Sequence, residues 1–323
     1  MKFNHKSIPS IRSKFKNIKN NIIVIGGGRW AKIILIELIS HFENIDKIIL
    51  ITGNKKIIEE LPSNIFKKKL YLKNNLNKIN LKKITHAIVV NKNKDHFLTS
   101  KKIIENNINV LVEKPLVSKI KEYEKLKKLS QKKKKFIHVS TPFFFAYYFF
   151  YIKKFIATNK PELFFEWHDP KKDKRHGFLK KYDKSITYLE DTTYHIYGIL
   201  NCIFGKKKIV YLSSKNFKNK GNVKFEYGKI RVNLNCSRNI EHERIRKIKI
   251  ICNKKNIRIN YSDDKKVTIN VNSRKIITNF KFCQKTLKYQ LFNFLNTKKY
   301  SKNYSLNDIR NFNSLIHLIK YLR

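Results

Sequence analysis

Residues 22–31 read IIVIGGGRWA, and this short stretch decides the fold. Its branched apolar residues predict a buried strand, and the apolar residues that follow at a 3.6-residue period predict a helix. Three consecutive glycines join the two elements, in a chain that has only 9 glycines. The run fits the GxGxxA pattern, in which Gly26 makes the tight turn, Gly28 lets a pyrophosphate approach the backbone and Ala31 lets the helix pack on the strand. An ordinary strand–helix turn is the alternative interpretation.

Residues 21–141 continue with the pattern of a parallel sheet covered by helices. Short branched-apolar runs alternate with longer segments of helical period. The predicted strands span residues 22–25, 47–52, 69–72, 87–90, 109–113 and 136–140, and the predicted helices span residues 30–42, 94–106 and 118–131. Six strands with helical crossovers in about 120 residues are typical of one Rossmann-type doubly wound domain.

The pattern changes after residue 141. Apolar and polar residues alternate from Lys208 onward, as in antiparallel strands with one solvent-exposed face. Two helices are predicted at the end, over residues 286–295 and 306–322, the second with Ser305 as its N-cap. The predicted fold class is therefore α/β: a Rossmann-type doubly wound parallel sheet (21–141), followed by an α+β domain with a mainly antiparallel open sheet (142–323). Residues 1–20 are predicted to be a basic N-terminal arm.

Two further segments of the second domain bear on the site. The aromatic run at residues 143–150 predicts packing between the domains, with a pocket for an apolar substrate as the alternative. Residues 167–170, WHDP, predict a turn because a proline and a lysine-rich segment follow the histidine and aspartate. The four cysteines show no CxxC pair and no close spacing to histidines, so we expect no metal site and no disulfide framework.

The formal net charge of +49 usually indicates a nucleic-acid or anionic-membrane partner. Here the lysines are spread over the whole chain, which is also rich in Ile, Asn, Phe and Tyr. All these residues have A/T-rich codons, so we attribute the charge to genome composition and predict no specific nucleic-acid partner. A basic nucleic-acid-binding protein stays as an alternative.

Localisation follows from what the sequence lacks. No run of 18 uncharged apolar residues is present, so we expect no membrane span and no membrane partner. The cysteine usage favours a reducing, cytoplasmic location. The basic opening of the chain, which contains no acidic residue, is also compatible with an organelle transit peptide.

The end of the second predicted strand bears on the choice of dinucleotide. An acidic residue there would accept hydrogen bonds from the adenosine ribose and select NAD. The chain has Thr52, Asn54 and Lys55 instead. A hydroxyl, an amide and a cation suit a 2′-phosphate, so the sequence favours NADP over NAD.

Three further segments resemble the Gfo/Idh/MocA oxidoreductase family. VLVEKPL at residues 110–116 looks like the Glu-Lys-Pro signature of that family, and AIVVNKNKDH at 87–96 is similar to its strand, turn and histidine segment. In the latter, Asn91 and Lys92 replace the usual Thr-Pro. DTTYH at 191–195 resembles the Asp-x-Gly-x-His-x-x-Asp segment, and Phe-Gly follows at 204–205. With the glycine turn, the order and spacing of all segments agree, so the resemblance extends over residues 21–323.

The resemblance implies an NAD(P)-dependent oxidoreductase that transfers hydride between nicotinamide and a small carbonyl or hydroxyl (sugar-like) or imine substrate. It implies that Lys114 polarises the substrate oxygen, that His195 donates or accepts the proton, and that Asp191 orients the histidine or binds substrate. A cation and a proton donor are also what carbonyl reduction needs, because negative charge develops on oxygen. The predicted cofactor-binding residues are Gly26, Gly28, Arg29, Trp30, Ala31, Thr52, Asn54, Lys55, Asn91, His96, Glu113 and Lys114.

The resemblance also implies a homo-oligomer formed through the sheet of the second domain. Two positions depart from the family pattern, since Thr193 stands where glycine is usual and Gly198 stands where the final aspartate is common. Loss of that carboxylate leaves a second interpretation open: a catalytically impaired dinucleotide-binding protein with a regulatory or scaffold function.

Overall fold

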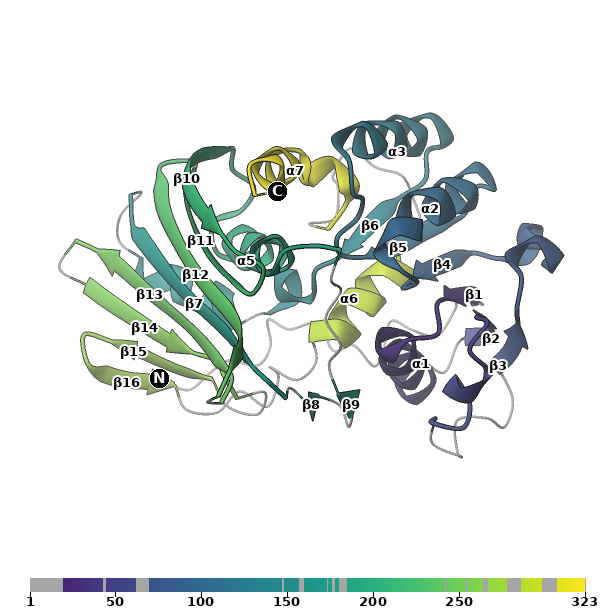
Figure 1. Cartoon of the computed structure of the whole chain (residues 1–323), viewed down its shortest axis with the longest axis horizontal. Helices are drawn as coiled ribbons and strands as arrows, with labels where there is room; N and C mark the ends of the chain where they lie inside the picture. Colours follow the sequence, from purple (N-terminus) through teal and green to yellow (C-terminus); the bar gives the residue numbers. More distant parts are fainter. Residues whose placement is uncertain are drawn as a thin grey trace.

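Two sheets organise the chain, and Figure 1 shows them at opposite ends of the molecule. The computed structural model describes residues 20–42, 45–61, 70–146, 148–156, 160–172, 174–175, 178–179, 185–241, 243–253, 255–263, 267–277, 286–297 and 307–322. Of the predicted N-terminal arm only Asn20 falls within these ranges, and Ser305 lies outside them.

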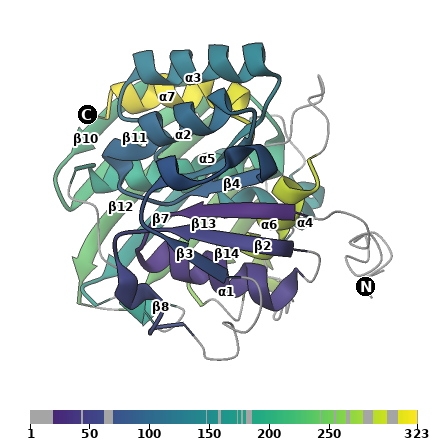
Figure 2. The same cartoon turned by 90° about the vertical axis from the view of Figure 1, so that its right-hand side faces the viewer.

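The first sheet is the predicted Rossmann sheet. Its strands are parallel, in the order β3-β2-β1-β4-β5-β6. They span β1 (Asn20–Ile25), β2 (Ile45–Ile51), β3 (Leu70–Lys73), β4 (His86–Val89), β5 (Asn109–Glu113) and β6 (Ile137–Ser140). The helices α2 (His96–Glu105) and α3 (Ile120–Lys133) cover one face, and α1 (Arg29–His41) covers the other (Figure 2). The order reverses between β1 and β4, which is where ligands bind in this type of sheet.

The second sheet has the order β10-β11-β12-β7-β13-β14-β15-β16. Only β12 and β7 pair in parallel, and the other neighbours are antiparallel. Its strands span β7 (Glu162–Pro170), β10 (Ile209–Asn216), β11 (Lys220–Tyr227), β12 (Ile230–Ile240), β13 (Ile245–Cys252), β14 (Lys255–Asn260), β15 (Thr268–Val271) and β16 (Arg274–Ile277). The helix α5 (Tyr188–Phe204) packs on β11 and β12. This architecture confirms the predicted fold class.

Short elements complete the described chain. They are the helix α4 (Tyr148–Ile152), the strand pair β8 (Lys174–Arg175) and β9 (Phe178–Leu179), and the 3-10 turns η2 (Lys55–Ile57), η4 (Leu76–Lys78), η5 (Leu81–Lys83), η6 (Asn93–Asp95), η7 (Pro142–Phe145), η8 (Lys153–Phe155) and η10 (Ile309–Asn311). Within the described ranges, no helix is both long and apolar enough to cross a membrane.

The prediction of a turn at residues 167–170 is wrong. These residues end β7, which lies inside the second sheet between β12 and β13. Leu163, Phe165 and Trp167 alternate along the strand and are buried. Proline is tolerated because Pro170 is the last residue of the strand, where the hydrogen-bonded ladder ends.

The single helix predicted over residues 306–322 is also wrong. The described part contains the 3-10 turn η10 and the helix α7 (Asn313–Lys320). Asp308 accepts a hydrogen bond from the backbone N–H of Arg310 at 3.0 Å and pairs with the Arg310 guanidinium. The chain before α7 also bonds to β6, because the backbone N–H of Val139 donates to the carbonyl of Asn307 at 2.7 Å. Tertiary pairing therefore displaces the start of the helix.

The C-terminal helices return to the Rossmann domain. Leu291, Phe294 and Leu295 of α6 (Thr286–Leu295) are buried in one cluster with side chains of α1, β1 and β2. The helix α7 contacts α3. Both helices were predicted within the second domain by sequence position. The helix α6 covers part of the first domain, and α7 contacts β10 and α5 of the second domain as well as α3 of the first.

The aromatic run packs where the two sheets approach. Phe144 is buried and contacts Tyr197 of α5 at 6.0 Å between ring centroids. Phe143 contacts Trp167 of β7 at 5.7 Å and His195 of α5 at 5.5 Å. These contacts are with elements of the second domain, whereas the sequence predicts packing between the domains. The η7 turn also contacts α6, the helix that covers part of the first domain.

Candidate active site

The glycine turn gives each of its three glycines a different surrounding. Gly26 has a φ of +144°, and a Cβ added there would lie 2.5 Å from the carbonyl oxygen of Val90. A Cβ on Gly27 would collide with the Thr52 hydroxyl. A Cβ on Gly28 would meet nothing within 4 Å, and Gly28 lies at the wall of a pocket just before α1. The first two positions need glycine because neighbouring parts of the protein leave no room for a side chain, whereas the third leaves room for a ligand.

The end of β2 folds over this turn. The Thr52 hydroxyl accepts a hydrogen bond from the backbone N–H of Asn54 at 2.9 Å. The side-chain amide of Asn54 donates to the carbonyl of Gly27 at 3.0 Å. Lys55 is exposed in η2. Two of the three residues that were predicted to select the dinucleotide therefore lie against the glycine turn.

A pocket of about 610 Å³ extends from the glycine turn to α5. The first domain contributes the ends of β1, β4 and β5, and the second contributes the start of α5 and a residue of β12. The lining includes most of the predicted cofactor residues, namely Gly28, Arg29, Trp30, Asn54, Asn91, His96, Glu113 and Lys114. Gly26, Thr52 and Ala31 are buried behind it.

Three buried acceptors belong to residues that line this pocket. The atoms Oε2 of Glu113, Oδ1 of Asn91 and Oδ1 of Asn93 have no hydrogen-bond partner among the residues that the structure describes. Burial raises the pKa of Glu113 to about 7, against the opposing effects of Lys114 and of a hydrogen bond from Ser140. Buried acceptors need donors, so this part of the pocket suits a ligand that carries several hydroxyl groups, such as a ribose.

His96 joins the ends of β4 and β5. Its Nδ1 lies 2.7 Å from the carbonyl oxygen of Pro115, and its Nε2 lies 3.3 Å from that of Asn91. The ring is buried in the first turn of α2. His96 therefore fixes the backbone that presents Lys114 on one side and Asn91 on the other.

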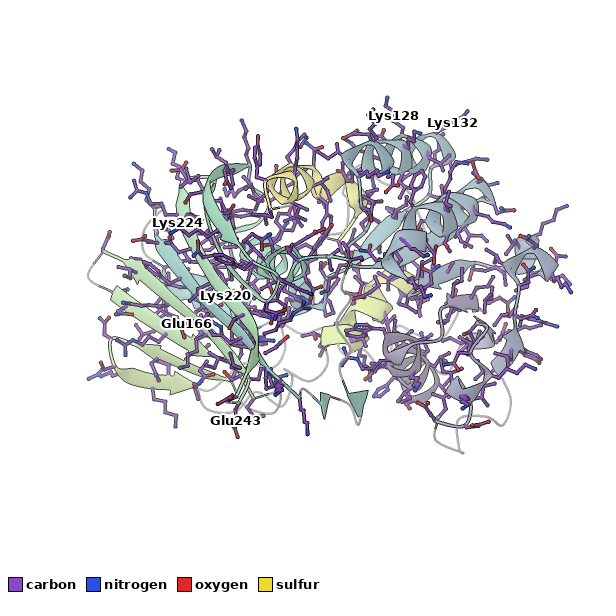
Figure 3. The ribbon with its side chains drawn as sticks, in the orientation of Figure 1. Lys128, Lys132, Glu166, Lys220, Lys224 and Glu243 are labelled. Atoms are coloured by element: carbon purple, nitrogen blue, oxygen red, sulfur yellow. The ribbon has the colours of Figure 1, made fainter. Side chains whose placement is uncertain are left out.

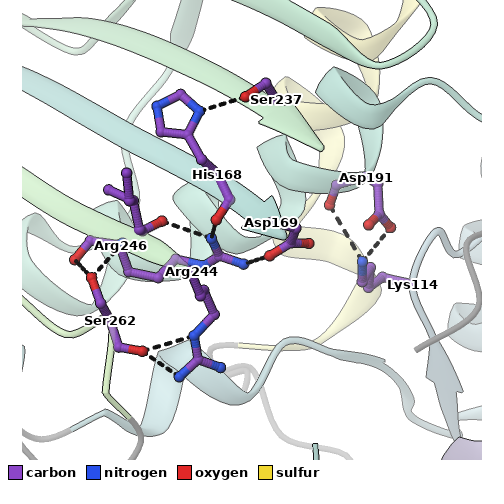
Figure 4. A network of polar contacts seen from close by, with 9 residues as sticks. Lys114, His168, Asp169, Asp191, Ser237, Arg244, Arg246 and Ser262 are labelled. Atoms are coloured by element: carbon purple, nitrogen blue, oxygen red, sulfur yellow. Dashed lines mark hydrogen bonds and ion pairs between the residues drawn. The ribbon is translucent and has the colours of Figure 1, made fainter. Parts of the chain in front are cut away.

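Lys114 and Asp191 connect the two domains at the far end of the pocket. The Lys114 ammonium forms an ion pair with the Asp191 carboxylate and lies 3.4 Å from the backbone carbonyl of the same residue (Figure 4). The side chains are 9% and 21% exposed. Thr187 caps α5 by accepting the N–H of Glu190 at 3.1 Å, and the first turn of a helix stabilises the Asp191 carboxylate.

His195 lies one turn further along α5. Its ring stacks on Trp167 with a centroid separation of 5.0 Å and an interplanar angle of 11°. The edge contact with Phe143 closes a second side, and Nδ1 is buried. The structure thus brings Lys114 and Asp191 into direct contact and places His195 beyond them in an aromatic surrounding.

The environment of Trp167 is itself charged. The Arg246 guanidinium lies 3.9 Å from the centroid of the Trp167 ring and forms an ion pair with Asp169. Both charged side chains are buried, and Arg246 also donates to the carbonyl of His168 at 2.7 Å (Figure 4). This pair holds the β7 segment against which His195 packs.

Gly198, one of the two departures from the family pattern, faces the η7 turn. A Cβ added there would lie 3.5 Å from Cβ of Phe143 and 3.6 Å from the backbone N of Phe144. Both are ordinary van der Waals distances, so the surroundings of Gly198 would accept a Cβ.

Other residues of the pocket were not predicted. Lys32 of α1, Glu60 after η2, Thr187 and Tyr188 at the start of α5, and Arg238 of β12 all line it. Only Thr187 carried a local signal, as a helix N-cap. The others reach the pocket through tertiary contacts, and Arg238 is held by the Asn219 amide oxygen at 2.8 Å. Among the described residues, no three His, Cys, Asp or Glu side chains gather as a metal site.

Comparisons with known proteins agree with this geometry. Residues 20–141 match the family model described as "Oxidoreductase family, NAD-binding Rossmann fold" of the Gfo/Idh/MocA family. No curated protein matches the sequence.

Solved structures share the fold over nearly the whole chain. A dehydrogenase, MviM, from Clostridium difficile superposes with a TM-score of 0.73 at 18% identity, covering 94% of this chain and 98% of that one. UDP-N-acetylglucosamine 3-dehydrogenase GnnA from Acidithiobacillus ferrooxidans gives 0.70 at 13% identity, covering 95% and 97%. A variant of KijD10, a 3-ketoreductase from Actinomadura kijaniata in complex with TDP-benzene and NADP, gives 0.70 at 12% identity, covering 94% and 97%.

The predicted resemblance is confirmed, both in the matched segment and in the architecture that follows it. Residues 20–141 thus form an NAD-binding Rossmann domain of the Gfo/Idh/MocA oxidoreductase family.

Proposed function

We propose that the protein is an oxidoreductase that transfers hydride between NADP and a small, sugar-like carbonyl or hydroxyl compound, or an imine. The observation that carries the proposal is a single pocket with the glycine turn at one end and the Lys114–Asp191 pair at the other. A dinucleotide bound at the glycine turn would supply or accept the hydride. The names of two similar proteins support a sugar-like substrate. GnnA is a UDP-N-acetylglucosamine 3-dehydrogenase, and KijD10 is a 3-ketoreductase.

The residues present fit the cofactor. The open space at Gly28 and the N-terminus of α1 suit a pyrophosphate. The buried acceptors of Glu113, Asn91 and Asn93 suit the hydroxyls of the nicotinamide ribose. Donors from those hydroxyls would favour the charged Glu113 carboxylate and lower its raised pKa.

The catalytic roles follow from the charges at the far end. Lys114 is a cation that can share its ammonium protons between Asp191 and a substrate oxygen, where negative charge develops during reduction. His195 is the proposed proton donor or acceptor, since imidazole exchanges protons near neutral pH. Asp191 holds Lys114 in place and lies one helical turn from His195, so it can position both.

NADP is preferred over NAD in this proposal. Thr52 and Asn54 place a hydroxyl and an amide at the end of β2, and Lys55 follows in η2. No carboxylate stands at that strand end to select the ribose hydroxyls of NAD.

A dinucleotide-binding scaffold without turnover is the second candidate. Gly198 favours it, because this position lacks the carboxylate that is common in the family pattern. The two candidates share the cofactor site and differ only in chemistry.

Calorimetry and a turnover assay test the proposal together. We expect NADPH to bind, a panel of ketosugars, aldehydes and imines to include a substrate, and Lys114→Met and His195→Asn each to lower kcat by at least about 100-fold. Lys101→Met, on the exposed face of α2, is the matched control and should leave kcat unchanged. Binding with no turnover of any compound favours the scaffold, and absence of nucleotide binding refutes both.

We also propose a homo-oligomer formed through the sheet of the second domain, as the family resemblance implies. Static light scattering of the same preparation measures the mass, and a monomeric mass at micromolar concentration would contradict this part.

A further inference from the structure

Lys32 and Glu60 form an ion pair in the wall of the pocket. Lys32 lies in the second turn of α1, and Glu60 follows η2 in the connection after β2. Their burial differs, because the Lys32 side chain is 10% exposed and that of Glu60 is 48% exposed. The lysine is thus fixed inside the protein, whereas the glutamate reaches it from the surface.

Both members of the pair follow closely in the chain on segments that bind a dinucleotide in doubly wound domains: Lys32 follows the glycine turn, and Glu60 follows the end of β2. Asn54, which lines the same pocket, donates to Gly27 and so connects the end of β2 with the glycine turn. In doubly wound domains the ribose of the adenosine lies at the end of the second strand, next to the turn that binds the pyrophosphate. A 2′-phosphate on that ribose would lie near Asn54, within the part of the pocket that Lys32 and Glu60 line.

A buried ammonium needs a counter-charge, and Glu60 supplies one. A phosphate dianion offers the same ammonium more charge and more acceptor oxygens than a carboxylate does. Glu60 is half exposed, so it can return to water once the phosphate supplies the counter-charge that the buried ammonium needs. The uncharged 2′-hydroxyl of NAD has no comparable means of displacing the carboxylate.

We infer that Lys32 is the cation that recognises the 2′-phosphate of NADP, and that Glu60 occupies this cation until the nucleotide binds. The inference rests on the proposed function, since it requires that a dinucleotide enters this pocket. It assigns cofactor selectivity to a residue of α1 and to a competing carboxylate, in addition to the residues at the end of β2. Glu60 then weakens NADP binding, and Lys32 strengthens it.

Two small probes separate the 2′-phosphate from the rest of the nucleotide. The binding of 2′,5′-ADP and of 5′-AMP is measured by calorimetry on the full chain and on Lys32→Gln, Glu60→Gln and the double variant. We expect Lys32→Gln to weaken the binding of 2′,5′-ADP by at least about 10-fold and to change the affinity for 5′-AMP by no more than about 2-fold. Glu60→Gln should tighten 2′,5′-ADP by about 3- to 10-fold without tightening 5′-AMP, because the competing carboxylate is removed.

Matched controls carry the same change of charge elsewhere. Glu59→Gln alters the adjacent exposed acid, and Lys101→Gln alters an exposed cation of α2 outside the pocket. Lys55→Gln is the comparison variant for the cation that follows β2. The inference is overturned if Lys32→Gln leaves 2′,5′-ADP binding unchanged, if Lys55→Gln alone causes the loss, or if both probes respond equally to Glu60→Gln. Thermal melts check that each variant folds. If Lys32→Gln does not fold, the double variant replaces it in the comparison, because that variant removes both charges of the ion pair.

The outcome for the proposed function is separate. If neither NADP nor NAD binds the unaltered protein, the proposed function fails and the inference fails with it. If NADP binds and the Lys32 and Glu60 variants behave like their controls, only the inference fails.

Discussion

Gly26 and Gly28 belong to one turn but are expected to tolerate substitution very differently. Gly28→Ala adds a methyl group in open space, so the melting temperature should change by no more than about 2 °C. The same methyl group faces the pocket, so it should weaken NADP binding by at least about 10-fold. Calorimetry and a thermal melt measure the two effects on one sample.

Gly26→Ala is the comparison variant. Its positive φ and the 2.5 Å approach to the Val90 carbonyl predict a loss of stability of about 1–3 kcal/mol even without a ligand. If Gly28→Ala binds NADP as tightly as the unaltered protein, the phosphates do not approach this glycine.

The residues that sequence analysis could identify are those that local pattern constrains. Gly28 and Lys114 belong to contiguous motifs, and the structure places both in the pocket. Lys32 and Glu60 carry no such pattern, because one lies in a helix, the other follows a 3-10 turn, and only the folded chain joins them. In a sequence with 72 basic residues, a lysine with a special environment cannot be recognised by composition.

At the scale of the elements, α6 is held on the sheet by two buried histidines. The Phe294 ring contacts His86 of β4 at 5.0 Å and His138 of β6 at 5.5 Å between centroids. Burial lowers the pKa of His86 to about 4 and that of His138 to about 3. Both rings are therefore neutral in the folded protein at pH 7, and α6 rests on uncharged aromatic neighbours.

Acid should weaken the folded state through these histidines. The unfolded chain takes up protons near pH 6.5 whereas the folded chain resists until about pH 4, so stability present above pH 6.5 is lost as the pH falls toward 4. For His86 the loss is on the order of 2 kcal/mol between pH 7 and pH 5. Urea unfolding at the two pH values should show this loss, and it should shrink in His86→Gln.

His41→Gln is the control for this experiment, because that ring is near the surface at the end of α1. The interpretation is contradicted if His86→Gln and His41→Gln change the pH dependence equally.

The strands show where prediction from sequence succeeds at this scale. Each of the six Rossmann strands was predicted within two residues of its position, because branched apolar runs bounded by polar residues specify buried parallel strands. The strand β7 was missed in part because Pro170 and the following lysines indicate a turn. Its central place in the sheet depends on β12 and β13, which follow it by some 60 to 80 residues in the chain.

At the scale of the whole molecule, basic side chains project from both domains. Figure 3 shows Lys128 and Lys132 on α3 and Lys220 and Lys224 on β11, far apart on the surface. Acidic residues such as Glu166 and Glu243 are interspersed. The charge is thus distributed over the surface, which is the arrangement expected from composition.

Such a surface should bind polyanions without selectivity. We expect the affinity for labelled duplex DNA to fall by at least about 1000-fold between 50 and 200 mM salt and to be indifferent to sequence, because counterion release drives the binding. Fluorescence anisotropy at several salt concentrations measures the slope. Retention of tight, sequence-dependent binding near 150 mM salt would favour the nucleic-acid alternative.

The order of domains was predictable at this scale, but the way in which the chain closes was not. The spacing of apolar residues along the chain distinguishes the parallel sheet of residues 21–141 from the mainly antiparallel strands after Lys208. The same period cannot tell which sheet an amphipathic helix will cover: α6 covers the distant one, whereas α7 contacts β10 of the second sheet and α3 of the first domain.

The return of α6 to α1 has a consequence for synthesis of the protein. When a ribosome has made residues 20–141, the apolar surface that later receives Leu291, Phe294 and Leu295 has no cover. Domains emerge in order, so this half must wait for almost the entire remaining chain, with a hydrophobic face accessible to chaperones or to other nascent chains. Because synthesis runs from the N-terminus to the C-terminus, the core of the Rossmann domain is complete only after α6 has left the ribosomal exit tunnel.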